Sequence, residues 1–208
     1  MKQLVIFFIL FFFIGYCYSQ QNVSSLPRTN YEIFSGLLNK CLDPVADRIT
    51  VLGSDKIYRL KINADAQSEK IFYNVFSLRF PGLKIIKGTG FDSLAFTISV
   101  SDIVFSLKYP ESKTMRLLGD KVISRSASVK FNCTAQSPSG EILWTEAPAE
   151  KKSDTFRQDN LDYVQTGEYD FIKAPLPEES LISKLIVPAV ILIATAIAII
   201  LFFAVRSK

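Results

Sequence analysis

The side chains that could carry out chemistry in this sequence are mainly carboxylates and cysteines, because none of the 208 residues is histidine. Without histidine the chain cannot assemble a Ser-His-Asp triad, a Cys-His pair, a histidine-ligated zinc site or a histidine pH switch. The cysteines are Cys17, Cys41 and Cys133, which are too few for a four-cysteine zinc site. We therefore expect no metal centre of these kinds and no cofactor.

A pair of carboxylates is the remaining catalytic possibility, as in sugar-processing enzymes that use two Asp or Glu residues. Asp92 and Asp102 flank one apolar segment and are the candidates for such a pair. The pair would need a cleft and a raised pKa for at least one carboxyl group. Other acidic residues fit no calcium-loop spacing, and we interpret them as solvated charges: Asp154, Asp159, Asp162, Glu168 and Asp170. The sequence thus favours a non-enzymatic protein, with a carboxylate-dependent enzyme as the alternative.

Cys41 and Cys133 both fall on apolar faces, one of an expected helix and the other of an expected strand. An oxidising compartment would permit a disulfide, but the two Cα atoms would have to approach within about 7 Å. A free cysteine also behaves as a small buried hydrophobic residue. We predict two buried thiols, with a disulfide as the alternative.

A connection between two long expected strands, residues 110–120 (PESKTMRLLGD), mixes basic and apolar side chains. Such a tip could press against lipid headgroups or a partner protein, or it could fold back on its own domain. The candidate contact residues are Lys113, Met115, Arg116, Leu117 and Leu118.

Two apolar segments frame the chain. Residues 1–19 combine one early charge at Lys2 with an apolar core and small residues near the end, which predicts a cleaved signal peptide. An uncleaved first membrane helix is the alternative. Residues 185–205 contain no charged residue. As a helix they would rise about 31 Å, close to the roughly 30 Å hydrocarbon core of a bilayer, so we predict a transmembrane helix there.

The charges around the second apolar segment predict its orientation. Arg206 and Lys208 follow it, and Lys and Arg favour the cytoplasmic side of a membrane. We expect a single-pass protein of the bacterial inner membrane, with its body in the periplasm and its C-terminus in the cytoplasm. The expected partners are the lipid bilayer, through the C-terminal helix, and another envelope protein. A formal net charge of only +4 on an exported chain argues against a nucleic-acid partner.

Between the two apolar segments the periodicity predicts an α+β domain. Helical spacing follows a cap at Thr29 or Asn30 and recurs over residues 64–80. Alternating spacing predicts strands over residues 56–63, 83–87, 93–109, 121–136 and 141–147. The predicted fold class is α+β, with two helices packed on a mostly antiparallel sheet that carries a long bulged hairpin, plus one C-terminal transmembrane helix.

The apolar residues of segment 93–109 change phase within the segment. They occupy even positions up to Val100 and odd positions from Ile103 onward. In a regular strand this change would turn every later side chain to the opposite face. One extra residue would restore a common face, so we predict a bulge at Ser101-Asp102 that keeps Phe105 buried.

Composition completes the predicted domain organisation. Periodicity is lost after residue 149, where Lys, Asp, Gln, Gly and Pro dominate and favour an extended tether. The expected parts are a signal peptide at 1–19, a lead-in at 20–29, an exported α+β domain at 30–149, a tether at 150–184, the transmembrane helix at 185–205 and a tail at 206–208.

The order of elements and the closing GEILW strand at Gly140–Trp144 resemble those of small bacterial envelope domains. These are the curli-secretion lipoprotein, the lipoprotein activators of penicillin-binding proteins, and the amino-terminal domain of the Tol-system propeller protein. The resemblance covers residues 31–147 and implies an accessory or assembly role without enzymatic activity. Several of these proteins are lipoproteins, whereas this chain ends in an apolar segment. We expect a protein-binding or assembly module, with a ligand-binding receptor domain as a further alternative.

Overall fold

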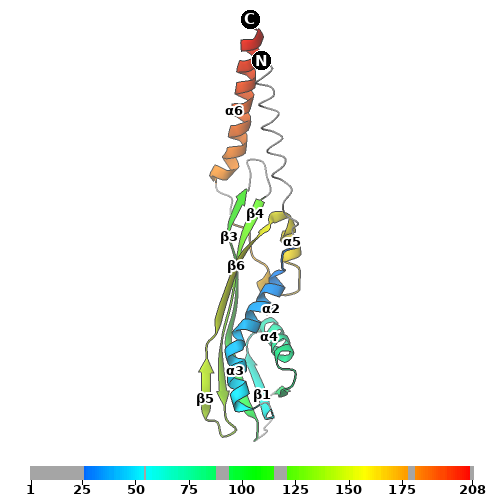
Figure 1. Ribbon diagram of the computed structural model, residues 1–208, viewed down its shortest axis with the longest axis vertical. Coiled ribbons are helices and arrows are strands. Elements are labelled where there is room, and N and C mark those ends of the chain that lie inside the picture. Colours follow the sequence, from blue (N-terminus) through cyan, green and yellow to red (C-terminus); the bar gives the residue numbers. More distant parts are fainter. Residues whose placement is uncertain (1–25, 54, 88–93, 115–120, 178–180, 207–208) are drawn as a thin grey trace.

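The structure is a computed structural model that describes residues 26–53, 55–87, 94–114, 121–177 and 181–206. Its body is a two-layer, mixed α/β fold in which helices lie against a six-stranded sheet (Figure 1). The helices of this layer are α2 (Asn30–Cys41), α3 (Asp43–Leu52) and α4 (Ala66–Arg79). The helices meet the sheet through a shared core in which the Phe72 ring of α4 lies edge-on to the Phe131 ring of the sheet.

The sheet has the order β2-β1-β3-β4-β5, and β6 also pairs with β4. Strand β1 runs parallel to β2 and β3, whereas all the pairs that β4 makes are antiparallel. The predicted α+β class is therefore corrected to a mixed α/β fold: the antiparallel succession expected for the last strands is present, but a parallel βαβ unit built from β1, α4 and β2 is joined to it, and three helices rather than two form the helical layer. The strands are β1 (Ile57–Asn63), β2 (Lys84–Lys87), β3 (Phe96–Thr114), β4 (Lys121–Gln136), β5 (Ile142–Glu146) and β6 (Ala149–Arg157).

The two main helices begin at side-chain caps. Thr29 and Glu32 form a capping box at α2, as the predicted cap at this position requires. Helix α4 is capped by Asp65 rather than by Asn63, which shortens the predicted helix at its start. The Asp65 carboxylate accepts hydrogen bonds at Ser68 and Gln67, and these bonds lower its pKa.

The predicted bulge in β3 is confirmed. Ser101 pairs with Asn132 and Val104 with Lys130, so two residues of β3 lie opposite one residue of β4. Asp102 adopts a positive φ of 55° at this point. Beyond the bulge, Phe105 packs against Phe34 and Phe171 in the core layer, but it is partly buried rather than buried as predicted.

A second bulge follows, which the sequence analysis missed. Lys108 pairs with Ser126 and Glu111 with Ser124, so Tyr109-Pro110 lies opposite Arg125. Proline has no N–H to donate to a strand ladder and is tolerated at bulges. Strand β3 therefore continues through Pro110 to Thr114, whereas the connection was expected to begin at Pro110.

Much of the segment expected to be a tether belongs to the folded body. Strand β6 pairs with residues 122–130 of β4, along the same edge that β5 occupies at residues 133–136. Three short helices follow, at Gln158–Asn160, α5 (Leu161–Val164) and Asp170–Ile172. Phe156, Val164 and Ile172 are buried. The physical reason is that β5 covers only one end of the long strand β4, and β6 satisfies the rest of its backbone.

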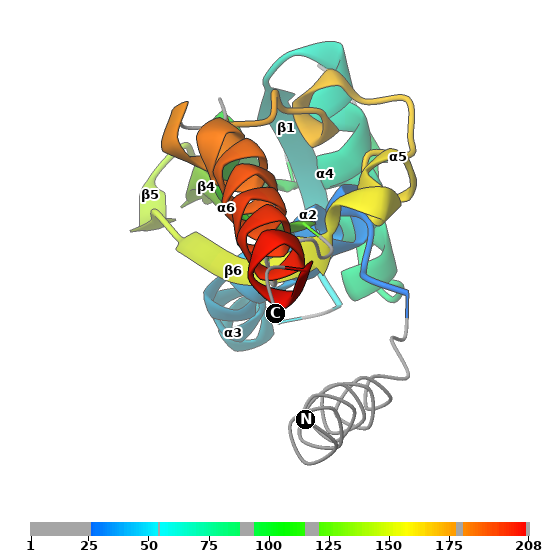
Figure 2. The same cartoon turned by 90° about the horizontal axis from the view of Figure 1, so that it is seen from above.

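The C-terminal helix requires a correction. Helix α6 (Leu181–Arg206) projects beyond the end of the sheet (Figure 1), and in the view from above it lies in front of the body (Figure 2). No helix is both long and apolar enough to cross a membrane in the part of the chain that the structure describes. The transmembrane helix predicted at 185–205 is therefore wrong, and the bilayer partner and single-pass topology that depended on it lose their support.

The predicted signal peptide at 1–19 lies outside the described residues.

Candidate functional site

The contact surface predicted at the tip of the long hairpin is only partly within the described residues. Lys113 lies near the end of β3, and its ammonium group is 2.9 Å from the Glu111 carboxylate in an exposed ion pair. Met115, Arg116, Leu117 and Leu118 lie outside the described residues. The proposed contact at this tip therefore stays a prediction.

The carboxylates considered for catalysis are not brought together by the described part of the chain. Asp102 is exposed at the first bulge, where its carboxylate accepts hydrogen bonds from the Ser101 hydroxyl and the Asn132 amide. Asp92 lies outside the described residues. Asp102 thus has a local role, which is to satisfy polar groups around a backbone irregularity.

The acidic residues of the last segment act individually. Asp154, Asp159 and Glu168 form ion pairs with Arg125, Arg157 and Lys70 respectively. Asp170 accepts a hydrogen bond from the Gln67 amide. No group of three or more His, Cys, Asp or Glu side chains that could hold a metal ion occurs among the described residues.

The cysteine prediction is confirmed, because Cys41 and Cys133 are both buried and both free. Burial raises the pKa of the Cys41 thiol to about 11; the negative charge of Glu150 adds to this rise, and a hydrogen bond with the Glu150 backbone opposes it. Burial likewise raises the pKa of the Cys133 thiol to about 12. Such thiols stay protonated at neutral pH and are poor nucleophiles, so they act as packing residues.

A buried polar network was missed by the sequence analysis. Arg125 is only 1% exposed, and its Nε and Nη2 atoms each lie 2.7 Å from one oxygen of Asp154. Its Nη1 donates to the Arg28 carbonyl and to the Asn30 side chain, each at 2.8 Å. The network ties β4 to β6 and to the start of α2.

The same network extends to the last described segment of the body. The Asn30 amide donates to the Tyr109 hydroxyl at 2.9 Å and to the Ile172 carbonyl at 2.7 Å. Gln165 donates to the Tyr109 hydroxyl and to the Ala174 carbonyl. Because its charges and amides are satisfied within the chain, we assign this network to the architecture rather than to ligand binding.

Strand β5 is the least protected edge of the sheet. It pairs with β4 on one side, and no strand within the described ranges pairs with its other side. Sheet edges are usually protected by charge, as in β6, which carries Lys151 and Lys152, and in β2, which begins and ends with lysine. The sequence of β5, ILWTE, has its single charge at the end.

Apolar side chains are exposed along this edge. Ile142 is 62% exposed and Leu143 is 37% exposed. Trp144 is half-buried, and its indole Nε1 is buried without a hydrogen-bond partner. An unpaired backbone edge with exposed apolar residues is suited to contact with another chain.

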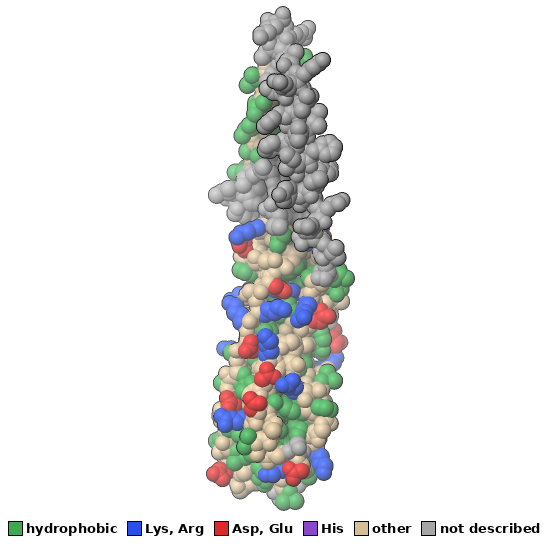
Figure 3. All heavy atoms as spheres, viewed as in Figure 1, with side chains coloured by type: hydrophobic (Ala, Val, Ile, Leu, Met, Phe, Trp, Pro, Cys, Tyr) green, Lys and Arg blue, Asp and Glu red, His purple; other side chains and the backbone are tan. Residues whose placement is uncertain are grey.

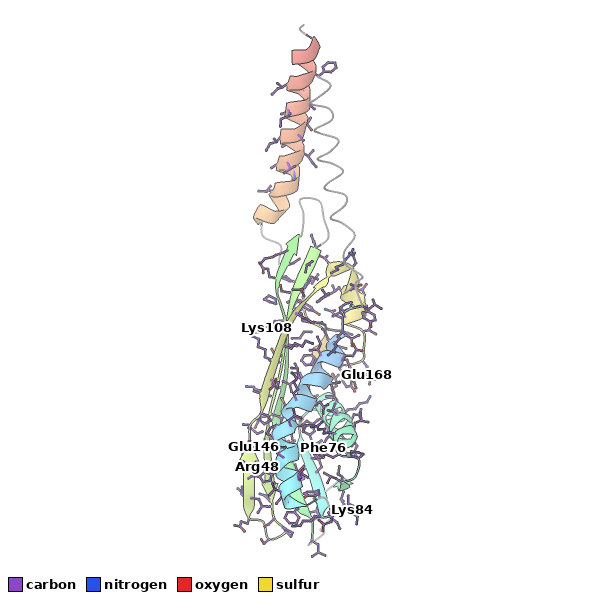
Figure 4. The ribbon with its side chains drawn as sticks, viewed as in Figure 1. Arg48, Phe76, Lys84, Lys108, Glu146 and Glu168 are labelled. Atoms are coloured by element: carbon purple, nitrogen blue, oxygen red, sulfur yellow. The ribbon has the colours of Figure 1, made fainter. Side chains whose placement is uncertain are left out.

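Helix α3 extends the same surface. The Arg48 Nε is 3.0 Å from the Glu146 carboxylate at the end of β5, and Figure 4 shows the two side chains next to each other. Val51 lies one helical turn beyond Arg48 and is 85% exposed. Figure 3 shows apolar side chains interspersed with charges of both signs on the face that carries α3. We call Val51, Ile142 and Leu143, with the free side of β5, the edge surface.

The fold and this surface define a two-layer α/β domain with an open sheet edge in the part of the chain that the structure describes. No family model matches the chain, and no curated protein matches it significantly. A minor lipoprotein from Acinetobacter baumannii matches with 13% identity and a TM-score of 0.34, over 50% of this chain and 67% of that protein. A neuraminyllactose-binding hemagglutinin homologue from Helicobacter pylori matches with 14% identity and a TM-score of 0.31, over 50% of this chain and 65% of that protein.

The structural neighbours thus include a bacterial lipoprotein and a bacterial hemagglutinin homologue, and the resemblance to the particular envelope domains expected from the sequence stays a prediction. At such low identities and TM-scores the likeness carries no functional argument. The function has to be argued from the residues of this chain.

Proposed function

We propose that this chain is a non-catalytic protein-binding module of the bacterial cell envelope, and that the edge surface is where it binds its partner. The observation that carries the proposal is the edge of β5, which no strand among the described residues pairs with on its outer side, with Ile142 and Leu143 exposed and a single charge at its end. The placement in the envelope is supported by the signal peptide predicted at residues 1–19.

The geometry of the edge indicates the form of the partner. A strand edge offers alternating N–H and C=O groups, which an extended peptide segment can satisfy by adding one more strand. The side chains of Ile142, Leu143 and Val51 would then contact apolar side chains of that segment. Strand β6 would be a poor substitute, because its lysines oppose strand addition.

Site-specific photo-crosslinking tests this proposal. A photoreactive amino acid would replace Ile142 in the full chain, expressed in its native cells. The matched control would carry it at Lys151, which is exposed on β6 along the same side of β4. We expect one defined crosslinked protein from position 142 and none from position 151.

A second variant makes the result specific to the edge. Leu143→Lys places a charge on β5 and should abolish the crosslink from position 142 while leaving the chain folded, because Leu143 is partly exposed. Identical products from positions 142 and 151, or a crosslink that survives Leu143→Lys, would contradict the proposal.

A further inference from the structure

Arg59 occupies an unusual position on the sheet. It lies in β1 between Tyr58 and Leu60, which face the helical core, so its own side chain is on the opposite face of the sheet. It is nevertheless only 9% exposed. Its neighbours across the ladder are Ile86 in β2 and Thr97 in β3.

The guanidinium group of Arg59 has donors that the protein does not use. Its Nε and Nη2 atoms are buried and have no hydrogen-bond partner. Buried charged groups are normally paired, because removal from water without a partner is costly. An orphaned guanidinium just below the surface therefore indicates a missing partner.

The protein itself shows what such a pair of nitrogens binds. Arg125 uses the same two atoms, Nε and Nη2, to hold both oxygens of the Asp154 carboxylate at 2.7 Å. This side of a guanidinium forms two parallel N–H donors that match two oxygens of one carboxylate or phosphate group. The unused donors of Arg59 thus have the geometry of an oxyanion site.

The strands around Arg59 supply no negative charge, which favours an anion that comes from another molecule. Strands β1 and β2, and residues 96–101 of β3, contain no Asp or Glu. Lys61 and Lys84 lie on the same face of the sheet as Arg59. Lys61 is two residues after Arg59 in β1, and Lys84 pairs with Ile57, which is two residues before Arg59. Figure 4 labels Lys84 at the end of the sheet that is farther from α6.

We propose that Arg59 is a binding site for an oxyanion, and that a carboxylate presented by another molecule is its preferred ligand. The two oxygens accept from Nε and Nη2, and Thr97, which pairs with Arg59 across the ladder, carries a hydroxyl that is a further donor. Rotation of the long arginine side chain brings the donors outward without moving the strand. This site is separate from the edge surface, because β3 and β4 lie between β1 and β5.

The test uses the full chain and two simple probes, sodium acetate and inorganic phosphate, at constant ionic strength set with chloride. The readout is the Nε–H nuclear magnetic resonance signal of Arg59. We expect a saturable shift with acetate, and Arg59→Lys should weaken acetate binding, read from neighbouring backbone signals, about tenfold or more, since lysine keeps the charge but loses the paired donors.

Lys61→Met is the matched control, because Lys61 is exposed on the same face of the same strand. It should change the acetate affinity less than about threefold, the loss expected for a screened surface charge. Tighter binding of phosphate than of acetate would assign the site to a phosphate-bearing ligand. No saturable shift of the Arg59 signal with either anion, or equal losses for both variants, would overturn the proposal. The measurement on the unaltered chain decides the question even if Arg59→Lys does not fold.

Discussion

Arg125 is a buried charged side chain whose counter-charge comes from one residue, Asp154. Its charge is almost fully buried, and its guanidinium also stacks 5.2 Å from the centre of the Phe156 ring. The Asp154 carboxylate that neutralises it comes from β6, and Asn30 contributes from α2. A change at Asp154 should therefore weaken the contacts that hold β4, β6 and α2 together.

We predict that Asp154→Asn lowers the free energy of unfolding by about 2 to 4 kcal/mol, because it leaves the buried Arg125 without a counter-charge. Asp159→Asn is the control, since it removes the same charge from an ion pair, to Arg157, at an exposed site. It should cost no more than about 1 kcal/mol. Urea unfolding of the two variants makes the comparison, and equal losses would contradict the role given to Arg125.

The thiol of Cys41 gives a prediction about pH. Its pKa is raised from 9.0 to about 11 in the folded chain, so above pH 9 the unfolded state releases its proton first. The stabilisation from this group is complete below about pH 9 and is lost as pH rises toward 11. Between pH 8 and 10.5 the native chain should lose about 1 to 2 kcal/mol more stability than Cys41→Ala.

Urea unfolding at the two pH values measures this difference. Other groups that titrate in the same range, such as Tyr58, are common to both proteins and cancel in the comparison. An equal pH dependence of the native chain and Cys41→Ala would show that the thiol does not keep its proton in the folded state.

Sequence reasoning succeeded for the cysteines and missed Arg125 for a clear reason. Cys41 and Cys133 repeat the apolar phase of their elements, so their burial follows from spacing alone. Arg125 has the same inward phase in β4, between Ile123 and Ala127, and that phase was the available signal. Spacing cannot identify a counter-charge on β6, a strand that the sequence did not predict.

At the scale of elements, the two bulges of β3 show what a pattern can and cannot reveal. The first was predictable because apolar residues on both sides of Ser101 change phase. The second is marked only by Pro110, a residue that also ends strands, and the sequence analysis therefore ended the strand there. Strand β6 was missed because its inward positions include the charged residues Glu150, Lys152 and Asp154, so the segment shows no alternation of apolar and polar side chains.

The first bulge makes a testable prediction about two adjacent residues. Phe105→Asp should lower the free energy of unfolding by more than about 3 kcal/mol, because it buries an unpaired charge among Phe34 and Phe171. Val104→Asp, on the 42% exposed side, should cost less than about 1 kcal/mol. Chemical unfolding of both variants tests it, and the reverse order of losses would mean that β3 continues without a bulge.

At the scale of the whole molecule, the body includes the chain up to the last short helix at Asp170–Ile172. Tyr169 stacks on Tyr31 at 5.7 Å between ring centres, and Ile172 is buried against the core. Tyr31, near the start of the body, and Tyr169 and Ile172, near its end, thus all pack in or against the same core. The sequence analysis assigned this region to a tether because its apolar residues are too widely spaced to show a period.

Amide hydrogen exchange should distinguish a strand from a tether. We predict that the amides of β6 that pair with β4 are protected to a similar degree as the other amides of the sheet. Residues 173–177, which lie in no helix or strand, serve as the internal comparison and should exchange faster. Exchange of residues 149–157 at the rate of an unstructured chain would show that this segment is a tether and not a strand.

The claim that matters most is that β5 accepts a strand from a partner, and hydrogen exchange on β5 tests it most directly. The full chain is compared alone and in complex with the protein crosslinked from position 142. Strand addition predicts that alternate amides of Ile142–Glu146 become protected in the complex, while those of β6 stay unchanged. Unchanged exchange on β5 in a complex that forms would contradict the account.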